Sequence, residues 1–120
     1  MNNNYTYRKL IVWQKSMELV TLIYKEVKVF PADELYALTS QIKRSATSIP
    51  SNIAEGYGRE GKKDYLRFLN IALSSLFELQ TQIEIAFNLA FIKEDNFNAL
   101  YDSTREIERM LTSFIRKIKA

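Results

Sequence analysis

The sequence predicts an all-α fold, an antiparallel up-down-up-down four-helix bundle that occupies residues 1–120 as a single domain. Two observations lead to this prediction. Apolar residues recur at alternating steps of three and four along four stretches of the chain, which places them on one face of a helix. Helix breakers are scarce, because the 120 residues include only three glycines and two prolines. A chain of this length can bury one apolar core.

The first predicted helix ends near Pro31, because proline cannot continue a helical hydrogen-bond ladder. Its expected core stripe consists of Leu10, Trp13, Met17, Val20, Tyr24 and Val27. The stripe of the second helix consists of Leu38, Ile42, Ala46, Ile49 and Ile53. Since that stripe resumes after Pro50, we expect the proline to kink this helix rather than end it. Gly56 or Gly58 is expected to supply the left-handed residue that closes it.

The third helix is predicted over residues 62–90 and the fourth around residues 97–118. The third stripe consists of Tyr65, Leu69, Ala72, Leu76, Leu79, Ile83, Ala86 and Ala90. The fourth consists of Phe97, Leu100, Thr104, Ile107, Leu111, Phe114 and Ile118. The connections between the predicted helices are short, and short loops join antiparallel neighbours.

Further apolar residues lie off these stripes, including Leu19, Ile23 and Phe77. A bundle that stays monomeric buries about three-sevenths of each helix, so this surplus exceeds what one core needs. A broad core with ordinary exposed apolar residues would account for part of it. We favour self-association through helices, because large exposed apolar patches are rare on monomers.

Composition excludes several classes of protein. The chain contains no cysteine and no histidine, so it lacks thiolate ligands, the commonest general base and the commonest nitrogen ligand of metals. The sequence therefore predicts no enzymatic activity, no metal site and no cofactor. No apolar run approaches the ~20 residues that span a bilayer, so no membrane association is expected and a cytoplasmic location is favoured.

Basic residues gather in three segments that the predicted topology brings to one end of the bundle. These segments are the start of the first helix, the connection between the second and third helices, and the C-terminus. The residues are Arg8, Lys9, Arg59, Lys62, Lys63, Arg67, Arg116, Lys117 and Lys119. Cations at the end of the last helix suit its macrodipole, but Lys62 and Lys63 begin a helix and oppose it. The basic end is therefore a candidate anion-binding face, against the alternative of a merely solvated one.

The second helix is unusually polar around Pro50. Its polar residues, with one from the third helix, form a predicted structural network of Gln41, Arg44, Ser48, Asn52, Glu55 and Glu78. Glu78 is the candidate partner of Arg44. The alternative is a carboxylate site built from Glu55 and Glu78, which lacks the third ligand that a metal would need.

The polar segment also carries a resemblance to a known family. The matching residues are Trp13-Gln14-Lys15, Phe30-Pro31, Leu38-Thr39-Ser40-Gln41-Ile42, Arg44, Ser48-Ile49-Pro50-Ser51-Asn52-Ile53-Ala54-Glu55-Gly56, Gly58-Arg59, Phe68-Leu69, Ile71-Ala72, Ser75-Leu76 and Glu78-Leu79. With these residues the chain resembles the four-helix-bundle proteins of intervening sequences in bacterial large-subunit ribosomal RNA genes. That family is similar to the accessory variability determinant of diversity-generating retroelements. The resemblance implies a homopentamer, and by analogy with the retroelement protein a partner among nucleic acids and a reverse transcriptase.

Together these observations predict a non-enzymatic homopentamer that binds RNA or DNA through backbone phosphates at its basic end. The alternative is a protein-interaction scaffold with no role in nucleic-acid binding, which would use the surplus apolar surface.

Overall fold

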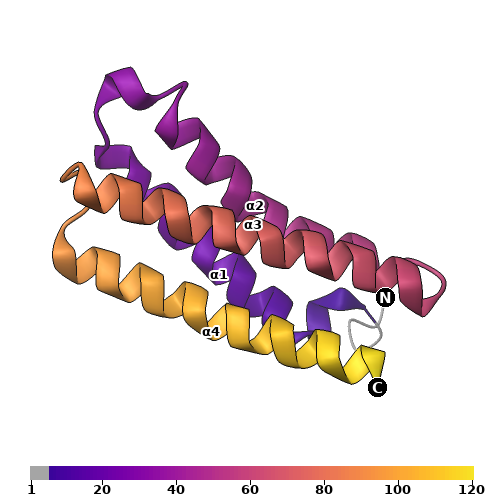
Figure 1. The fold of residues 1–120 in the computed structure, drawn as a ribbon. Coiled ribbons are helices and arrows are strands. Elements are labelled where there is room, and N and C mark those ends of the chain that lie inside the picture. Colours follow the sequence, from indigo (N-terminus) through magenta and orange to yellow (C-terminus); the bar gives the residue numbers. More distant parts are fainter. Residues whose placement is uncertain (1–5) are drawn as a thin grey trace.

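The computed structural model describes residues 6–120 and is all-α over that range, with four long helices and no strand (Figure 1). The helices are α1 (Ile11–Glu26), α2 (Leu38–Tyr57), α3 (Lys62–Asn88) and α4 (Glu94–Lys119). Short 3-10 turns lie at Tyr7–Lys9, Val27–Val29 and Ala32–Glu34. The prediction of four helices is confirmed. None of the helices in the described range is long and apolar enough to cross a membrane.

The four helices form a closed set of neighbours. Each helix contacts the next one in the chain, α1 also contacts α4, and the most extensive contact is between α2 and α3. The start of the described chain, the C-terminus and the α2–α3 loop lie at one end of the molecule, and the other two connections lie at the opposite end (Figure 1). The molecule measures 43 × 30 × 22 Å, so its two ends are separate surfaces.

The stripes predicted for the second, third and fourth helices lie on the buried faces, except that Ala90 of the third stripe is exposed and lies beyond the end of α3. Their central residues are fully buried, and the largest of them are Ile42, Ile49, Ile53, Leu69, Leu76, Leu79, Ile83, Ile107 and Leu111. Alternating steps of three and four were therefore sufficient to identify the buried face of these three helices.

The predicted stripe of the first helix was wrong at two positions. Met17 and Tyr24 are exposed, at 43% and 40% of their surface, whereas Leu19 and Ile23 are only 1% exposed. The buried face of α1 also includes Ser16. Its hydroxyl donates a hydrogen bond to the carbonyl of Val12 at 2.7 Å, so its burial leaves no unsatisfied donor. A polar residue thus lies on the buried face, and a search for apolar spacing passes over it.

Pro50 does not end helix α2, as predicted, and a kink at Pro50 stays a prediction. Nearby side chains donate hydrogen bonds to carbonyl groups of the same helix. Thr47 Oγ1 donates to the carbonyls of Lys43 and Arg44 at 3.0 and 3.1 Å, and Asn52 Nδ2 donates to that of Ser48 at 2.8 Å. Pro50 has no backbone N–H, so one carbonyl in the preceding turn of α2 lacks its helical hydrogen-bond donor. The side-chain bonds of Thr47 and Asn52 lie in the turns around this position.

The loop after α2 differs from the prediction. Gly58 follows the helix with a φ of −80°, and Gly56 lies within α2. The glycine with a left-handed backbone is instead Gly61, whose φ is 87° and which immediately precedes α3. Glycine is favoured there because a side chain would strain that conformation.

Helix α3 ends two residues before the predicted limit, because Ala90 adopts a φ of 65°. The N–H of Phe91 donates to the carbonyl of Ala86 and that of Ala90 to the carbonyl of Phe87, both at 2.9 Å. These two bonds define a Schellman motif, which normally places glycine at the left-handed position. An alanine in this place gives no sequence signal for the end of a helix.

Candidate nucleic-acid interface

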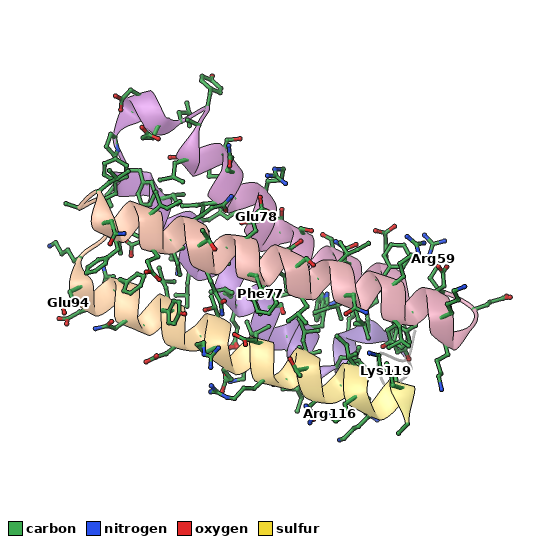
Figure 2. All side chains as sticks on the ribbon, in the orientation of Figure 1. Arg59, Phe77, Glu78, Glu94, Arg116 and Lys119 are labelled. Carbon is green, nitrogen blue, oxygen red and sulfur yellow. The ribbon has the colours of Figure 1, made fainter. Side chains whose placement is uncertain are left out.

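The basic residues predicted from the sequence converge on one end of the molecule. Figure 2 shows Arg59, Arg116 and Lys119 at that end and Glu94 at the opposite end. The turn that contains Arg8 and Lys9 contacts both α1 and α2. It lies towards the same end of the molecule as the C-terminus and the α2–α3 loop (Figure 1).

Most of these cations have no ionic partner in the described residues. Seven of them are exposed and form no ion pair within residues 6–120, namely Arg8, Lys9, Lys62, Lys63, Arg116, Lys117 and Lys119. Arg8 lies 5.9 Å from the centroid of the Trp13 ring. Unpaired, hydrated cations remain available to an anionic ligand, because no salt bridge has to be broken first.

Arg59 and Arg67 have a more defined environment. The guanidinium carbon of Arg59 lies 4.7 Å from the centroid of the Phe68 ring, and that of Arg67 lies 4.5 Å from the same centroid. Glu55 lies 3.7 Å from Arg59, and Asp64 lies 3.0 Å from Arg67. One ring, which is itself buried, therefore orients two cations from separate segments.

Aromatic rings at this end are mostly occupied by neighbours. Tyr57 is partly exposed and meets Tyr65 edge to face at 6.3 Å. Tyr65 also packs on Phe114 at 5.9 Å, and its buried hydroxyl has no hydrogen-bond partner in residues 6–120. Burial, with a smaller contribution from Tyr57, raises the pKa of Tyr65 from 10.0 to about 12. This tyrosine is therefore neutral at physiological pH.

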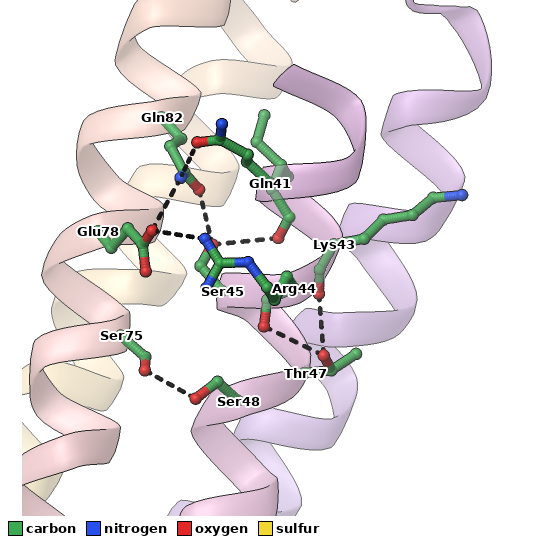
Figure 3. A network of polar contacts seen from close by, with 10 residues as sticks. Gln41, Lys43, Arg44, Ser45, Thr47, Ser48, Ser75, Glu78 and Gln82 are labelled. Carbon is green, nitrogen blue, oxygen red and sulfur yellow. Dashed lines mark hydrogen bonds and ion pairs between the residues drawn. The ribbon is translucent and has the colours of Figure 1, made fainter. Parts of the chain in front are cut away.

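The predicted polar network links α2 to α3 (Figure 3). Arg44 donates to Glu78 at 3.0 Å, which is the pair expected from the sequence. Ser48 and Ser75 hydroxyls lie 2.8 Å apart, and Asn52 Nδ2 donates to Ser48 Oγ at 2.9 Å.

The centre of this network is Gln82, which was not among the residues predicted from the sequence. Its Oε1 accepts a hydrogen bond from Ser45 at 2.7 Å, and its Nε2 donates to Glu78 at 3.2 Å and to Gln41 at 3.4 Å. Gln82 and Ser75 are both buried on α3. They lie seven residues apart, which places them on the same face of α3 beside its apolar stripe. From the sequence, this spacing could have indicated that α3 carries buried polar residues facing α2.

Glu55 lies outside the network, contrary to the prediction. Its carboxylate is exposed and pairs with Arg59 one helical turn away. Glu55 shares a helix face with Asn52, but it lies in the last turn of α2, next to the α2–α3 loop and away from the other network residues. It therefore belongs to the basic end, and it lies apart from Glu78. The structure does not bring Glu55 and Glu78 together as a carboxylate site, and no group of three potential metal ligands occurs within the described part of the chain.

The described residues thus define a helical protein with a basic end and a polar seam between two helices. A family model described as the 23S rRNA-intervening sequence protein matches residues 8–113, and the chain belongs to this family.

Among solved structures, the chain is similar to a protein of unknown function from the S23 ribosomal protein family of Bacteroides thetaiotaomicron. The two share 28% sequence identity with a TM-score of 0.82, over 88% of this chain and 96% of that one. A search of curated proteins finds no match. Neither the family description nor that of the solved structure names an enzymatic activity. The expected similarity to a retroelement protein stays a prediction.

Proposed function

We propose that this chain is a non-enzymatic cytoplasmic protein that binds RNA or DNA through backbone phosphates, as a homopentamer of antiparallel up-down-up-down bundles. The observation that carries the proposal is the group of exposed, mostly unpaired cations that three segments bring to one end. Phosphate contacts by such residues release condensed counterions, and this release drives association. The end opposite the basic residues carries Asp33, Glu34, Glu94 and Asp95, so the charge is polarised along the molecule.

The basic end is suited to contacts with phosphates rather than bases. Its cations lie on a loop, a short turn and helix ends, and no helix within residues 6–120 presents a row of side chains that would read base edges in a groove. We therefore expect binding with little sequence preference and strong salt dependence. Five copies in one assembly would multiply weak contacts by proximity.

Exposed apolar side chains support the assembly. Ile11, Leu22 and Phe77 are 60%, 47% and 45% exposed in the single chain, and burial between copies would remove them from water. Light scattering on a size-exclusion column measures the mass directly. A species of 14.0 kDa at micromolar concentration would contradict the oligomer.

The binding test is a titration of labelled RNA and DNA at two salt concentrations. The test variant replaces Lys62, Lys63, Lys117 and Lys119 with Glu. A matched control replaces four lysines that lie away from the basic end, Lys25, Lys28, Lys43 and Lys93, with Glu. We expect the test variant to lose binding and the control, which has the same net charge, to retain most of it. Equal losses in both variants would mean that only net charge matters, and no binding by the unmodified protein at low salt would refute the proposal.

The alternative function is a scaffold for another protein, such as a reverse transcriptase. One observation favours it: apolar side chains are strongly exposed at the end opposite the basic residues, where Tyr36 is 93% and Val29 73% exposed. Nearby lies a groove of about 560 Å³ lined by Leu22, Val29 and Phe91 among others. Failure of nucleic-acid binding with retention of the oligomer would favour this alternative.

A further inference from the structure

We propose that Arg59 and Arg67, held by the ring of Phe68, form a clamp for two successive phosphates of one nucleic-acid strand. This inference rests on the proposed function and names Arg59 and Arg67 as the residues that hold the nucleic-acid backbone in a defined position. The lysines of the basic end would then contribute attraction without a defined geometry. Phe68 acts as a positioning residue, since its ring is buried and directs the cations that touch the ligand.

The geometry shows how the two arginines are held. Arg59 lies in the α2–α3 loop and Arg67 in the second turn of α3, yet both guanidinium carbons lie within 4.7 Å of one ring centroid. A planar guanidinium stacked on a ring has fewer conformations to lose on binding than a free lysine side chain. The pair is therefore organised before a ligand arrives.

Hydrogen-bond donors remain available on both arginines. Arg67 contacts a single carboxylate oxygen of Asp64, through Nε and Nη2, both at 3.0 Å. Arg59 makes only the 3.7 Å ion pair with Glu55, which is too long for a hydrogen bond, and no other polar contact within residues 6–120. A guanidinium carries five N–H donors along its edges, so each of the two arginines keeps free N–H groups that can donate to phosphate oxygens. Their side chains are 45% and 58% exposed.

The spacing suits neighbouring phosphates of one strand. The two guanidinium carbons cannot be further apart than their two distances to the shared centroid laid end to end. Phosphates along one strand of a duplex recur with an axial rise of roughly 3.4 Å. Successive phosphates are further apart than this rise, because the strand also winds around the axis, and the upper bound on the guanidinium separation leaves room for that larger distance. The ring of Phe68 is 7% exposed and faces the cations, which leaves it unable to stack on a base. The clamp would therefore hold the backbone and ignore base identity.

The test uses the full chain with Arg59→Lys and Arg67→Lys together, which keeps the charge but removes the planar fork. The matched control is Arg44→Lys with Arg105→Lys, because both of these arginines are exposed, ion-paired to Glu78 and Glu108, and not stacked on a ring in the described chain. The probe is a labelled 20-nucleotide single-stranded RNA and the DNA of the same sequence. We expect the clamp variant to lose about tenfold in affinity, with a nearly unchanged salt slope, and the control to stay within about twofold.

A second variant tests the positioning role of Phe68. Phe68→Leu should weaken binding in the unmodified protein, but it should add no further loss once Arg59 and Arg67 are lysines. A purely structural role would produce the same loss in both backgrounds and would overturn the assignment. Equal affinity of the clamp variant and the control would overturn the clamp while the proposed function stands. No binding by the unmodified protein at low salt would overturn both.

Discussion

Gly56 lies where α2 packs tightly against the first turns of α3, and an added methyl group would disturb that contact. A Cβ atom at this position would lie 2.8 Å from Phe68 Cβ, 3.1 Å from Tyr65 Cδ1 and 3.3 Å from the carbonyl oxygen of Tyr65. Two of these atoms cannot rotate away, because one is a backbone oxygen and the other is a Cβ fixed to the backbone. The substitution Gly56→Ala therefore requires the two helices to separate.

The magnitude follows from two opposed effects. Alanine is favoured over glycine inside a helix by about 1 kcal/mol. Overpacking of a well-packed contact costs about 1–3 kcal/mol, and the short distances to fixed atoms place this site in the upper part of that range. We expect Gly56→Ala to lower the free energy of unfolding by about 1–2 kcal/mol, which lowers the melting temperature by roughly 5 °C for a domain of this size.

Urea unfolding followed by circular dichroism measures this change at a fixed concentration of chain, because oligomer stability depends on concentration. The control is Gly58→Ala. The nearest atom to its added Cβ is the Glu55 carbonyl oxygen at 3.6 Å, and its φ of −80° suits alanine. Gly58→Ala should leave stability unchanged or raise it slightly. If Gly56→Ala is as stable as the unmodified protein, the close approach of α2 and α3 is not a constraint and the reasoning fails.

Three further changes test other parts of the structure. Ala90→Gly should raise the free energy of unfolding by about 1 kcal/mol in the same urea assay, because it relieves the left-handed alanine; a loss of stability would contradict the Schellman assignment. The raised pKa of Tyr65 means that the unfolded chain loses its phenolic proton first, so unfolding should become easier as the pH rises from 10 towards about 12. Tyr65→Phe should remove that component from thermal melts across this range, and an unchanged pH profile would refute the assignment. Ser45→Ala should cost about 1–2 kcal/mol because Gln82 Oε1 loses its buried donor. Adding Gln82→Leu should recover most of this loss, whereas additive losses would show that the bond is unimportant.

The sequence was sufficient for most of the fold because buried faces repeat at helical spacing. It failed for α1, where two stripes with helical spacing compete and the buried one contains Ser16. It also failed at the end of α3, because Ala90 takes a place that glycine usually fills. The two failures have different causes: burial of a self-satisfied polar residue hides the buried face of α1, whereas local backbone hydrogen bonds hold an alanine in the left-handed position after α3.

The candidate interface was predictable in outline, because topology alone brings the three basic segments to one end. The pairing of Arg44 with Glu78 was also expected from the sequence, and the structure contains it. The cluster of Arg59 and Arg67 on Phe68 was not predictable, since it depends on side-chain directions across a loop. Gln82 was missed because the search followed polar residues along α2, while the residue that joins them lies on α3.

Stability and binding should respond in opposite directions at one part of the basic end. Lys62 and Lys63 occupy the first positions of α3, where the positive end of the helix dipole disfavours cations by a few tenths of a kcal/mol each. Lys117 and Lys119 lie in the last turn of α4, where the dipole favours them. Replacing the first pair with Glu should raise the free energy of unfolding by about 0.5–1 kcal/mol and weaken nucleic-acid binding.

The same change at the α4 pair should lower both quantities, so each pair is the control for the other in urea unfolding and salt-dependent titrations. Residues that the fold disfavours need a reason outside the fold, and the first pair is therefore the stronger evidence for an anionic ligand. If replacing Lys62 and Lys63 with Glu stabilises the protein and leaves binding intact, these lysines contribute neither to stability nor to binding. The nucleic-acid interface would then exclude the start of α3.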